Sequence, residues 1–172
     1  MNTSLLTPTA LALALTGCVS QRGFPPEHQI VNFDKVDSQI YRGAQPTVNG
    51  FEFLRTLGVK SVVSLRLAKD VLPDEKEAVE QLGLTFTNLP MSGMAPPTVA
   101  EMNRMLDAIE RLPQPVFIHC QFGCDRTGIV VACWRIRQSK WPRAKALREA
   151  KAYGISPLLV GMRSFVLNFK GN

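Results

Sequence analysis

The sequence predicts a single α/β domain with a mostly parallel central sheet of four to five strands, flanked by helices. Two observations support this fold class. Segments rich in β-branched and aromatic residues alternate along the chain with segments of helical periodicity, an order typical of parallel sheets covered on both faces. The 172 residues, 45% of them hydrophobic, suffice for one core and are too few for two comfortable domains.

The first elements follow the usual signals for starts and stops. A strand is expected at 39–42 and ends at Gly43. A helix at 51–57 has Asn49 placed to cap its start. The β-branched run at 59–65 is typical of a buried strand.

The next elements continue the alternation. A helix at 73–82 begins with Pro73 and carries acidic residues near the positive end of its dipole. Alternating polar and apolar residues predict a strand at 84–89. Thr98 and Glu101 then form a capping box that starts another helix.

The last third of the chain holds one strand and three helices. The strand at 116–119 leads directly into Cys120. A strongly apolar helix at 127–137 follows it and is expected to be central. Two further helices are predicted at 142–153 and 158–169.

The N-terminal segment has the features of a processing signal. Residues 10–18 read Ala-Leu-Ala-Leu-Ala-Leu-Thr-Gly-Cys, which is too short to cross a bilayer but has the length of a signal-peptide core. Leu-Thr-Gly-Cys resembles the lipobox of bacterial lipoproteins, which implies a signal peptide at 1–17, lipid attachment at Cys18 and a place in the cell envelope. The alternative is a frayed N-terminus on a cytoplasmic protein. Residues 18–36 are expected to be a linker and 37–172 the folded domain.

The net charge of +6 and the pI near 9.4 favour anionic partners. Phosphorylated substrates, an acidic lipid surface and nucleic acid all fit this charge. No run of five Lys or Arg residues occurs and aromatic residues are only 8%, so a nucleic-acid partner is not expected.

One segment between a buried strand and a buried helix carries the chemistry. In open α/β sheets, ligands bind beyond the carboxyl ends of the strands, where this segment lies. The five residues between Cys120 and Arg126 are enough to curl the backbone around one tetrahedral oxyanion, and the following helix adds its dipole. Gly123 allows a backbone conformation that a Cβ would penalise. The predicted phosphate-binding residues are Gln121, Phe122, Gly123, Cys124, Asp125 and Arg126.

Individual side chains of this segment suit a nucleophilic mechanism. Inward-pointing amides and Arg126 would stabilise a thiolate at Cys120. Arg126 can bind two phosphate oxygens at once and keeps its charge. Thr127 can donate a hydrogen bond to the sulfur when it leaves, and His119 is expected to support the loop rather than act as an acid or base.

The pattern His119-Cys120, five residues, Arg126-Thr127-Gly128 resembles the signature loop of the protein-tyrosine and dual-specificity phosphatase superfamily. Residues 41–46, Tyr-Arg-Gly-Ala-Gln-Pro, also resemble the first strand and turn of small dual-specificity-like phosphatases. The resemblance implies a cysteine-phosphatase-like fold and hydrolysis of phosphoesters through a phosphocysteine on Cys120. It implies neither a metal nor another cofactor.

The sequence departs from the pattern of this superfamily at the expected position of the general acid. These enzymes usually take an Asp from a loop before the signature, and the expected place, 90–97, contains no carboxylate. The leaving group still needs a proton unless it is already a good one. The best substitute is Asp125, as in myotubularin-type and Sac-type phosphatases. Alternatively, Asp125 only supports Arg126, and Asp70 and Asp74 are the remaining candidates.

The substrate and the redox role of the other cysteines stay open. The loop lacks the Lys residues typical of enzymes for highly phosphorylated inositols, so a less charged or aromatic phosphoester is expected, although Arg42, Arg66 and Lys69 could line the rim. Cys124 or Cys133 could form a protective disulfide with Cys120, or could simply be buried thiols.

Two other functional classes compete with a phosphatase. One is a sulfur-transfer or arsenate-reducing enzyme, and the other is an envelope-tethered phosphate- or phosphoprotein-binding module without turnover. The expected partner is a phosphorylated protein or small molecule, and a monomer is expected.

Overall fold

Strands and helices alternate along the chain in the computed structural model, which describes residues 22–171. The strands are β1 (Asp34–Lys35), β2 (Ile40–Ala44), β3 (Ser61–Ser64), β4 (Thr85–Asn88) and β5 (Val116–Cys120). The helices are α1 (Val48–Thr56), α2 (Glu75–Gln81), α3 (Val99–Arg111), α4 (Asp125–Arg137), α5 (Arg143–Ala152) and α6 (Val160–Asn168), with a short 3-10 helix at Ala68–Asp70.

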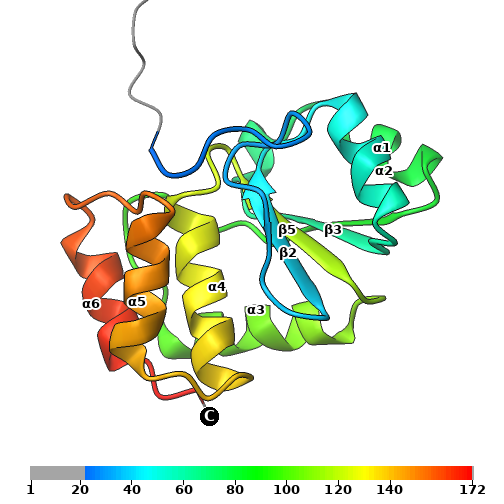
Figure 1. Cartoon of the computed structure of the whole chain (residues 1–172). Coiled ribbons are helices and arrows are strands. Elements are labelled where there is room, and N and C mark those ends of the chain that lie inside the picture. The colour runs from blue at the N-terminus through cyan, green and yellow to red at the C-terminus, as the bar shows by residue number, and fades with distance from the viewer. Residues whose placement is uncertain (1–21, 172) are drawn as a thin grey trace, which may run out of the picture.

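The five strands form one sheet in the order β1-β2-β5-β3-β4 (Figure 1). Only β1 is antiparallel to its neighbour, and the other pairs are parallel. The predicted, mostly parallel sheet is therefore confirmed. Because Ala44 at the end of β2 pairs with Cys120 at the end of β5, both strands end at the same edge of the sheet.

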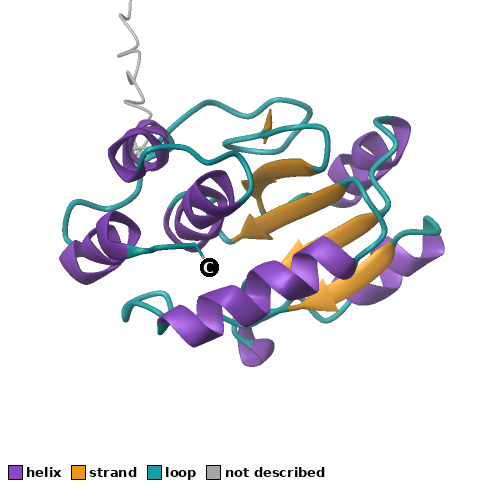
Figure 2. Ribbon diagram, turned by 90° about the horizontal axis from the view of Figure 1, so that it is seen from below, coloured by secondary structure: helices purple, strands orange, loops and turns teal. Residues whose placement is uncertain are grey.

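Helices cover both faces of the sheet (Figures 1 and 2). Successive side chains of a strand point to opposite faces, so Val116 and Ile118 of β5 pack with α3, α4, α5 and α6. Phe117, between them, packs with α1 and α2. β5 is thus buried on both faces, and Cys120 is its last residue.

The helix starts show which local signals the chain uses. The capping box of Thr98 and Glu101 is present and begins α3. The expected cap at Asn49 is wrong, since Thr47 accepts the hydrogen bond from Gly50 N and α1 begins at Val48.

The linker expected at 18–36 is wrong for its described part, because the chain from Arg22 onward packs on the domain. Ile30 is fully buried and lies over Gly43, where a Cβ would come 2.6 Å from its side chain. β1 also falls in this stretch. The predicted signal peptide and Cys18 lie outside the described residues. Within residues 22–171, no helix is long and apolar enough to span a membrane.

Candidate active site

The candidate active site is the loop from Gln121 to Cys124, which joins β5 to α4 at the carboxyl edge of the sheet. Cys120 is the last residue of β5 and is almost completely buried. α4 begins at Asp125, two residues earlier than expected, so its N-terminal amides lie in the segment that contains Arg126. An anion held by the loop would therefore lie at the positive end of a helix of 13 residues.

Gly123 makes the curvature of the loop possible, as the sequence predicted. Its φ of +68° lies in the left-handed region. A Cβ at this position would come 2.6 Å from backbone atoms of Gly43 and Ala44. The loop thus rests directly on the end of β2, at a distance that only glycine permits.

Three consecutive carbonyl groups of the loop are held by hydrogen bonds from outside it. They are Gln121 O with Gln45 N at 3.4 Å, Phe122 O with Asn32 Nδ2 at 2.9 Å, and Gly123 O with Arg42 Nη2 at 2.8 Å. In a trans peptide the N–H points away from the C=O. The amides of the three following residues therefore face away from the supporting segments, which is the arrangement of an anion-binding loop.

Arg42 lies beneath the loop and not on its rim, contrary to the expectation from sequence. Its side chain is almost fully buried and stacks on Tyr153, with the guanidinium carbon 3.6 Å from the ring centre. Burial lowers the pKa of Arg42 to about 10, against the opposing influence of Tyr153 and Glu149. Arg42 is thus still cationic at neutral pH, and its charge is close to the loop.

Arg126 lies in the first turn of α4 and is half-buried, so it can reach a ligand held by the loop. Its Nη1 lies 3.4 Å from the carbonyl oxygen of Leu65. Its Nε lies near Gly93, where a Cβ would be 4.0 Å away. Among residues 22–171, no carboxylate forms an ion pair with Arg126. Its guanidinium can therefore bind two oxygens of an anion.

Asp125, the predicted general acid, is engaged on the outer side of the loop. Arg22 Nη1 and Nη2 donate to its two oxygens at 3.1 and 2.8 Å, and Ser156 N donates to Oδ1 at 2.7 Å. To act as a general acid, Asp125 would have to carry a proton and would first have to lose its ion pair with Arg22. The acid role stays a prediction, and the geometry adds a competing role as an anchor.

His119 is fully buried and is supported by a carboxylate that sequence reasoning did not single out. His119 Nε2 lies 2.9 Å from Oε1 of Glu75, which also accepts a hydrogen bond from Gln45 Nε2 at 2.7 Å. Arg66 Nη1 donates in turn to Gln45 Oε1 at 3.0 Å. Burial raises the pKa of Glu75, but the hydrogen bonds and charge of His119, with smaller help from Gln45, outweigh it and lower that pKa overall. Glu75 shares the buried face of α2 with Val79, four residues on, and this spacing was the available signal.

A family model described as DSP-PTPase phosphatase fused to NAD+ kinase matches residues 25–163. The chain belongs to this family. The match begins well before residue 37, in agreement with the packing of the N-terminal segment.

Two curated relatives show how far the sequence similarity extends. The chain is 33% identical over 124 residues to inositol diphosphatase DSP3 of Arabidopsis thaliana, covering 69% of this chain and 60% of DSP3. It is 30% identical over 126 residues to dual specificity protein phosphatase TpbA of Pseudomonas aeruginosa, covering 72% of this chain and 55% of TpbA. The aligned region thus spans little more than half of each relative.

Solved structures support the fold. The P. aeruginosa TpbA structure has a TM-score of 0.60 at 27% identity and covers 87% of this chain and 99% of that one. The catalytic core of SIW14 from S. cerevisiae has a TM-score of 0.72 at 24% identity, with 86% of this chain and 88% of that one covered. At such low identity, the second match shows similarity of fold alone.

The roles predicted for Thr127 and for the other two cysteines, Cys124 and Cys133, stay predictions. Thr127 is buried, and its hydroxyl lies 3.5 Å from Gly43 O, so its proposed hydrogen bond to the sulfur stays a prediction. Cys120, Cys124 and Cys133 are free thiols. Burial raises the pKa of Cys124 and of Cys133, which keeps both protonated at neutral pH. Their protective role against oxidation remains a prediction.

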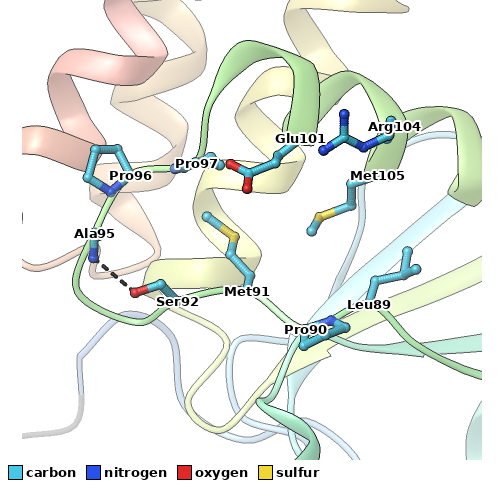
Figure 3. Close-up of a pocket in the computed structure, with 10 residues that line it drawn as sticks. All are labelled: Leu89, Pro90, Met91, Ser92, Ala95, Pro96, Pro97, Glu101, Arg104 and Met105. Atoms are coloured by element: carbon cyan, nitrogen blue, oxygen red, sulfur yellow. Dashed lines mark hydrogen bonds between the residues drawn. The ribbon is translucent and has the colours of Figure 1, made fainter.

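The loop at 90–97, where the family resemblance placed an acid, borders a cavity of about 480 Å³ beside α3 (Figure 3). Glu101 is the carboxylate that lines this cavity, but hydrogen bonds from the backbone and hydroxyl of Thr98 lower its pKa, so it is a poor proton donor near neutral pH. Asp70 and Asp74, the other candidates, are exposed and form no hydrogen bond with the signature loop. Within the described chain, no group of three or more His, Cys, Asp or Glu residues could hold a metal ion.

Proposed function

We propose that the protein is a phosphomonoesterase of the dual-specificity type that acts through a phosphocysteine on Cys120. The observation that carries the proposal is the cradle beside this thiol, in which three held carbonyls turn three amides toward one side and Arg126 forms no ion pair with a carboxylate of residues 22–171. The relatives support it, because TpbA is named a dual specificity protein phosphatase and DSP3 an inositol diphosphatase. A TpbA variant has also been solved in complex with pTyr, at 26% identity and a TM-score of 0.59.

The geometry suggests two displacement steps. In the first, the Cys120 thiolate attacks phosphorus, so an S–P bond forms and the ester P–O bond breaks while the loop amides and Arg126 hold the phosphoryl oxygens. The departing oxygen takes a proton from an acid or leaves as a stable anion. In the second, water attacks phosphorus, the S–P bond breaks, and Thr127 is the candidate to stabilise the returning thiolate.

The uncharged side chains at the outer tip of the loop indicate which phosphoesters the protein would prefer. Gln121 and Phe122 are exposed there, and neither carries a charge. This favours substrates with one phosphoryl group next to an apolar or aromatic part over highly phosphorylated inositols. A screen of phosphotyrosine peptides, phosphoserine peptides and inositol phosphates tests this ranking. Fastest turnover of inositol polyphosphates would reverse it.

Hydrolysis of p-nitrophenyl phosphate tests the mechanism. Wild-type protein should turn over this substrate, and Cys120→Ser should reduce the rate to the background of the assay, because a hydroxyl is a far weaker nucleophile than a thiolate. Cys133→Ala, which removes a thiol from the interior of α4, is the matched control and should stay active. Full activity of Cys120→Ser would overturn the mechanism. Phosphate binding without turnover by wild type would favour the binding-module alternative.

A leaving-group series tests Asp125. If this residue is the general acid, Asp125→Asn should slow phenyl phosphate, with its poor leaving group, far more than p-nitrophenyl phosphate. If it only anchors the loop through Arg22, both substrates should lose the same factor. The ratio of the two losses decides between the roles.

The position of the fold relative to Cys18 supports a proposal about location. The described part of the chain begins at Arg22, four residues after Cys18, and four residues span at most about 14 Å. We infer that a lipid-anchored chain would hold the signature loop next to the envelope membrane. Cys18→Ala should release the protein from the membrane fraction and block precursor processing. Unchanged fractionation would leave the cytoplasmic alternative.

A further inference from the structure

The segment from Arg22 to Asn32, here called the strap, lies against the outer side of the signature loop. Arg22, at one end, forms the two-pronged ion pair with Asp125 in the first turn of α4. Asn32, at the other end, is fully buried. The strap thus contacts the loop at two points that are close in space but ten residues apart in the chain.

Asn32 uses both ends of its amide at this junction. Its Nδ2 lies 2.9 Å from Phe122 O and 3.1 Å from Arg22 O, and its Oδ1 accepts a hydrogen bond from Phe24 N at 2.6 Å. The same Nδ2 lies 3.2 Å from Cys124 Sγ. One buried side chain therefore joins the two ends of the strap to the middle of the loop.

The backbone at this junction is shaped around that side chain. Asn32 has a φ of +56°, a conformation that Asn and Asp tolerate better than other residues with a Cβ. Gly23 has a φ of +85°, and a Cβ there would come 2.1 Å from Asn32 Oδ1. Neither position could readily take an ordinary side chain while the amide keeps its contacts.

The contact with Phe122 O bears directly on anion binding. It holds the peptide between Phe122 and Gly123 with its carbonyl toward the strap, so that the Gly123 N–H points to the opposite side. Because glycine populates more of φ/ψ space than other residues, the Phe122–Gly123 peptide can rotate when no hydrogen bond holds its carbonyl group. Without Asn32, the carbonyl could turn toward the anion, replacing an attractive dipole with a repulsive one.

We propose that Asn32 and Arg22 are positioning residues, which set the affinity of the signature loop for a phosphoryl group by fixing the Phe122–Gly123 peptide and the start of α4. The inference rests on the proposed function only in taking a phosphoryl group as the ligand. It adds a requirement outside the signature motif: the loop binds phosphate well only while the strap is docked.

The test measures inorganic phosphate binding in the full chain. Asn32→Asp keeps the size and the backbone preference but replaces the Nδ2 donor with an ionisable oxygen, whereas Asn32→Ala removes the whole contact without adding charge. Each should raise both the inhibition constant of inorganic phosphate and the KM for p-nitrophenyl phosphate about tenfold, with a smaller change in kcat. Arg22→Gln should weaken phosphate several-fold, and Arg22→Lys should recover part of the loss. Arg55→Gln is the control, because it removes the same positive charge from an exposed position on α1.

Thermal unfolding of each variant separates positioning from stability. A lower melting temperature with phosphate affinity within threefold of wild type would mean that the strap only stabilises the fold, and would overturn the proposal. Arg22→Gln, at a partly exposed site, keeps the test decisive if Asn32→Ala does not fold. Repeating the phosphate titration in the Cys120→Ser background by calorimetry makes the result independent of turnover. Failure of the phosphatase proposal would then remain distinguishable from failure of this one.

Discussion

Glu75 provides the sharpest test of how the tertiary structure supports His119, the residue before the proposed nucleophile. In Glu75→Ala, Nε2 of the buried His119 loses the carboxylate oxygen 2.9 Å away, and Nε2 of the half-buried Gln45 loses its hydrogen-bond acceptor. Each orphaned donor costs about 1–3 kcal/mol, so a loss of about 4 kcal/mol in the free energy of unfolding is expected. For a domain of this size, that corresponds to a melting temperature lower by about 8–16 °C. Glu75→Gln keeps one acceptor oxygen and should lose about 1–2 kcal/mol.

The pH dependence of this effect has a definite sign. Because the folded-state pKa of Glu75 lies below its ordinary value of 4.5, the ionised carboxylate stabilises the fold above that pH. The contribution is lost as the pH falls through the folded-state pKa. The stability difference between wild type and Glu75→Gln should therefore be complete at pH 7 and shrink below about pH 4.

Urea unfolding monitored by circular dichroism at several pH values measures both effects. Glu77→Ala and Glu77→Gln, at an exposed position on the same turn of α2, are the matched controls and should change stability by less than about 0.5 kcal/mol. Equal stability of Glu75→Ala and Glu77→Ala at pH 7 would contradict this role of Glu75. A stability difference between wild type and Glu75→Gln that grows on acidification would contradict it as well.

Two further substitutions test the loop itself. Gly123→Ala should lower the melting temperature and reduce kcat/KM at least tenfold, because the new Cβ would collide with backbone atoms of β2. Gly83→Ala is the control, since Gly83 has a similar φ of +75° but open space around it. This variant should lose only about 1–2 kcal/mol of stability, which is the cost of the left-handed conformation. Equal behaviour of these two variants would argue against the close approach. Arg126→Lys replaces a planar fork with a point charge and should reduce kcat/KM about 100-fold, or about 2.7 kcal/mol. Arg111→Lys, at an exposed site in α3, is its control, and a loss below threefold at position 126 would mean that two-pronged binding is not used.

The sequence could predict the loop because its requirements are local. A strand that ends at Cys120, a glycine with positive φ and a helix that starts near Arg126 are all encoded within ten residues. Periodicity also predicted the order of strands and helices, since a buried face repeats every 2 residues in a strand and every 3.6 in a helix.

The supporting contacts could not be predicted in the same way. Asn32 and Phe122 are 90 residues apart in the chain, and Glu75 and His119 are 44 apart. Nothing in a local pattern relates such positions, and the Pro- and Gly-containing segment around Gly23 is typical of a linker until it is seen packed. The expectation that Arg42 lies on the rim was wrong because its partners are also distant in the chain. The buried guanidinium stacks on the ring of Tyr153 and donates a hydrogen bond to Gly123 O.

The sequence by itself predicted the α/β order of the chain, which the structure confirms, and led to the proposal of Cys120 as nucleophile in a phosphate-binding segment, because these predictions need only residue type and spacing along the chain. Only the tertiary structure decided what holds that segment in shape. Peptide orientation in the loop depends on donors from β2 and from the strap, and His119 depends on a carboxylate from α2. These contacts exist only after distant parts of the chain have packed together, since the entropy of closing such long loops is repaid by the shared core and not by any single contact.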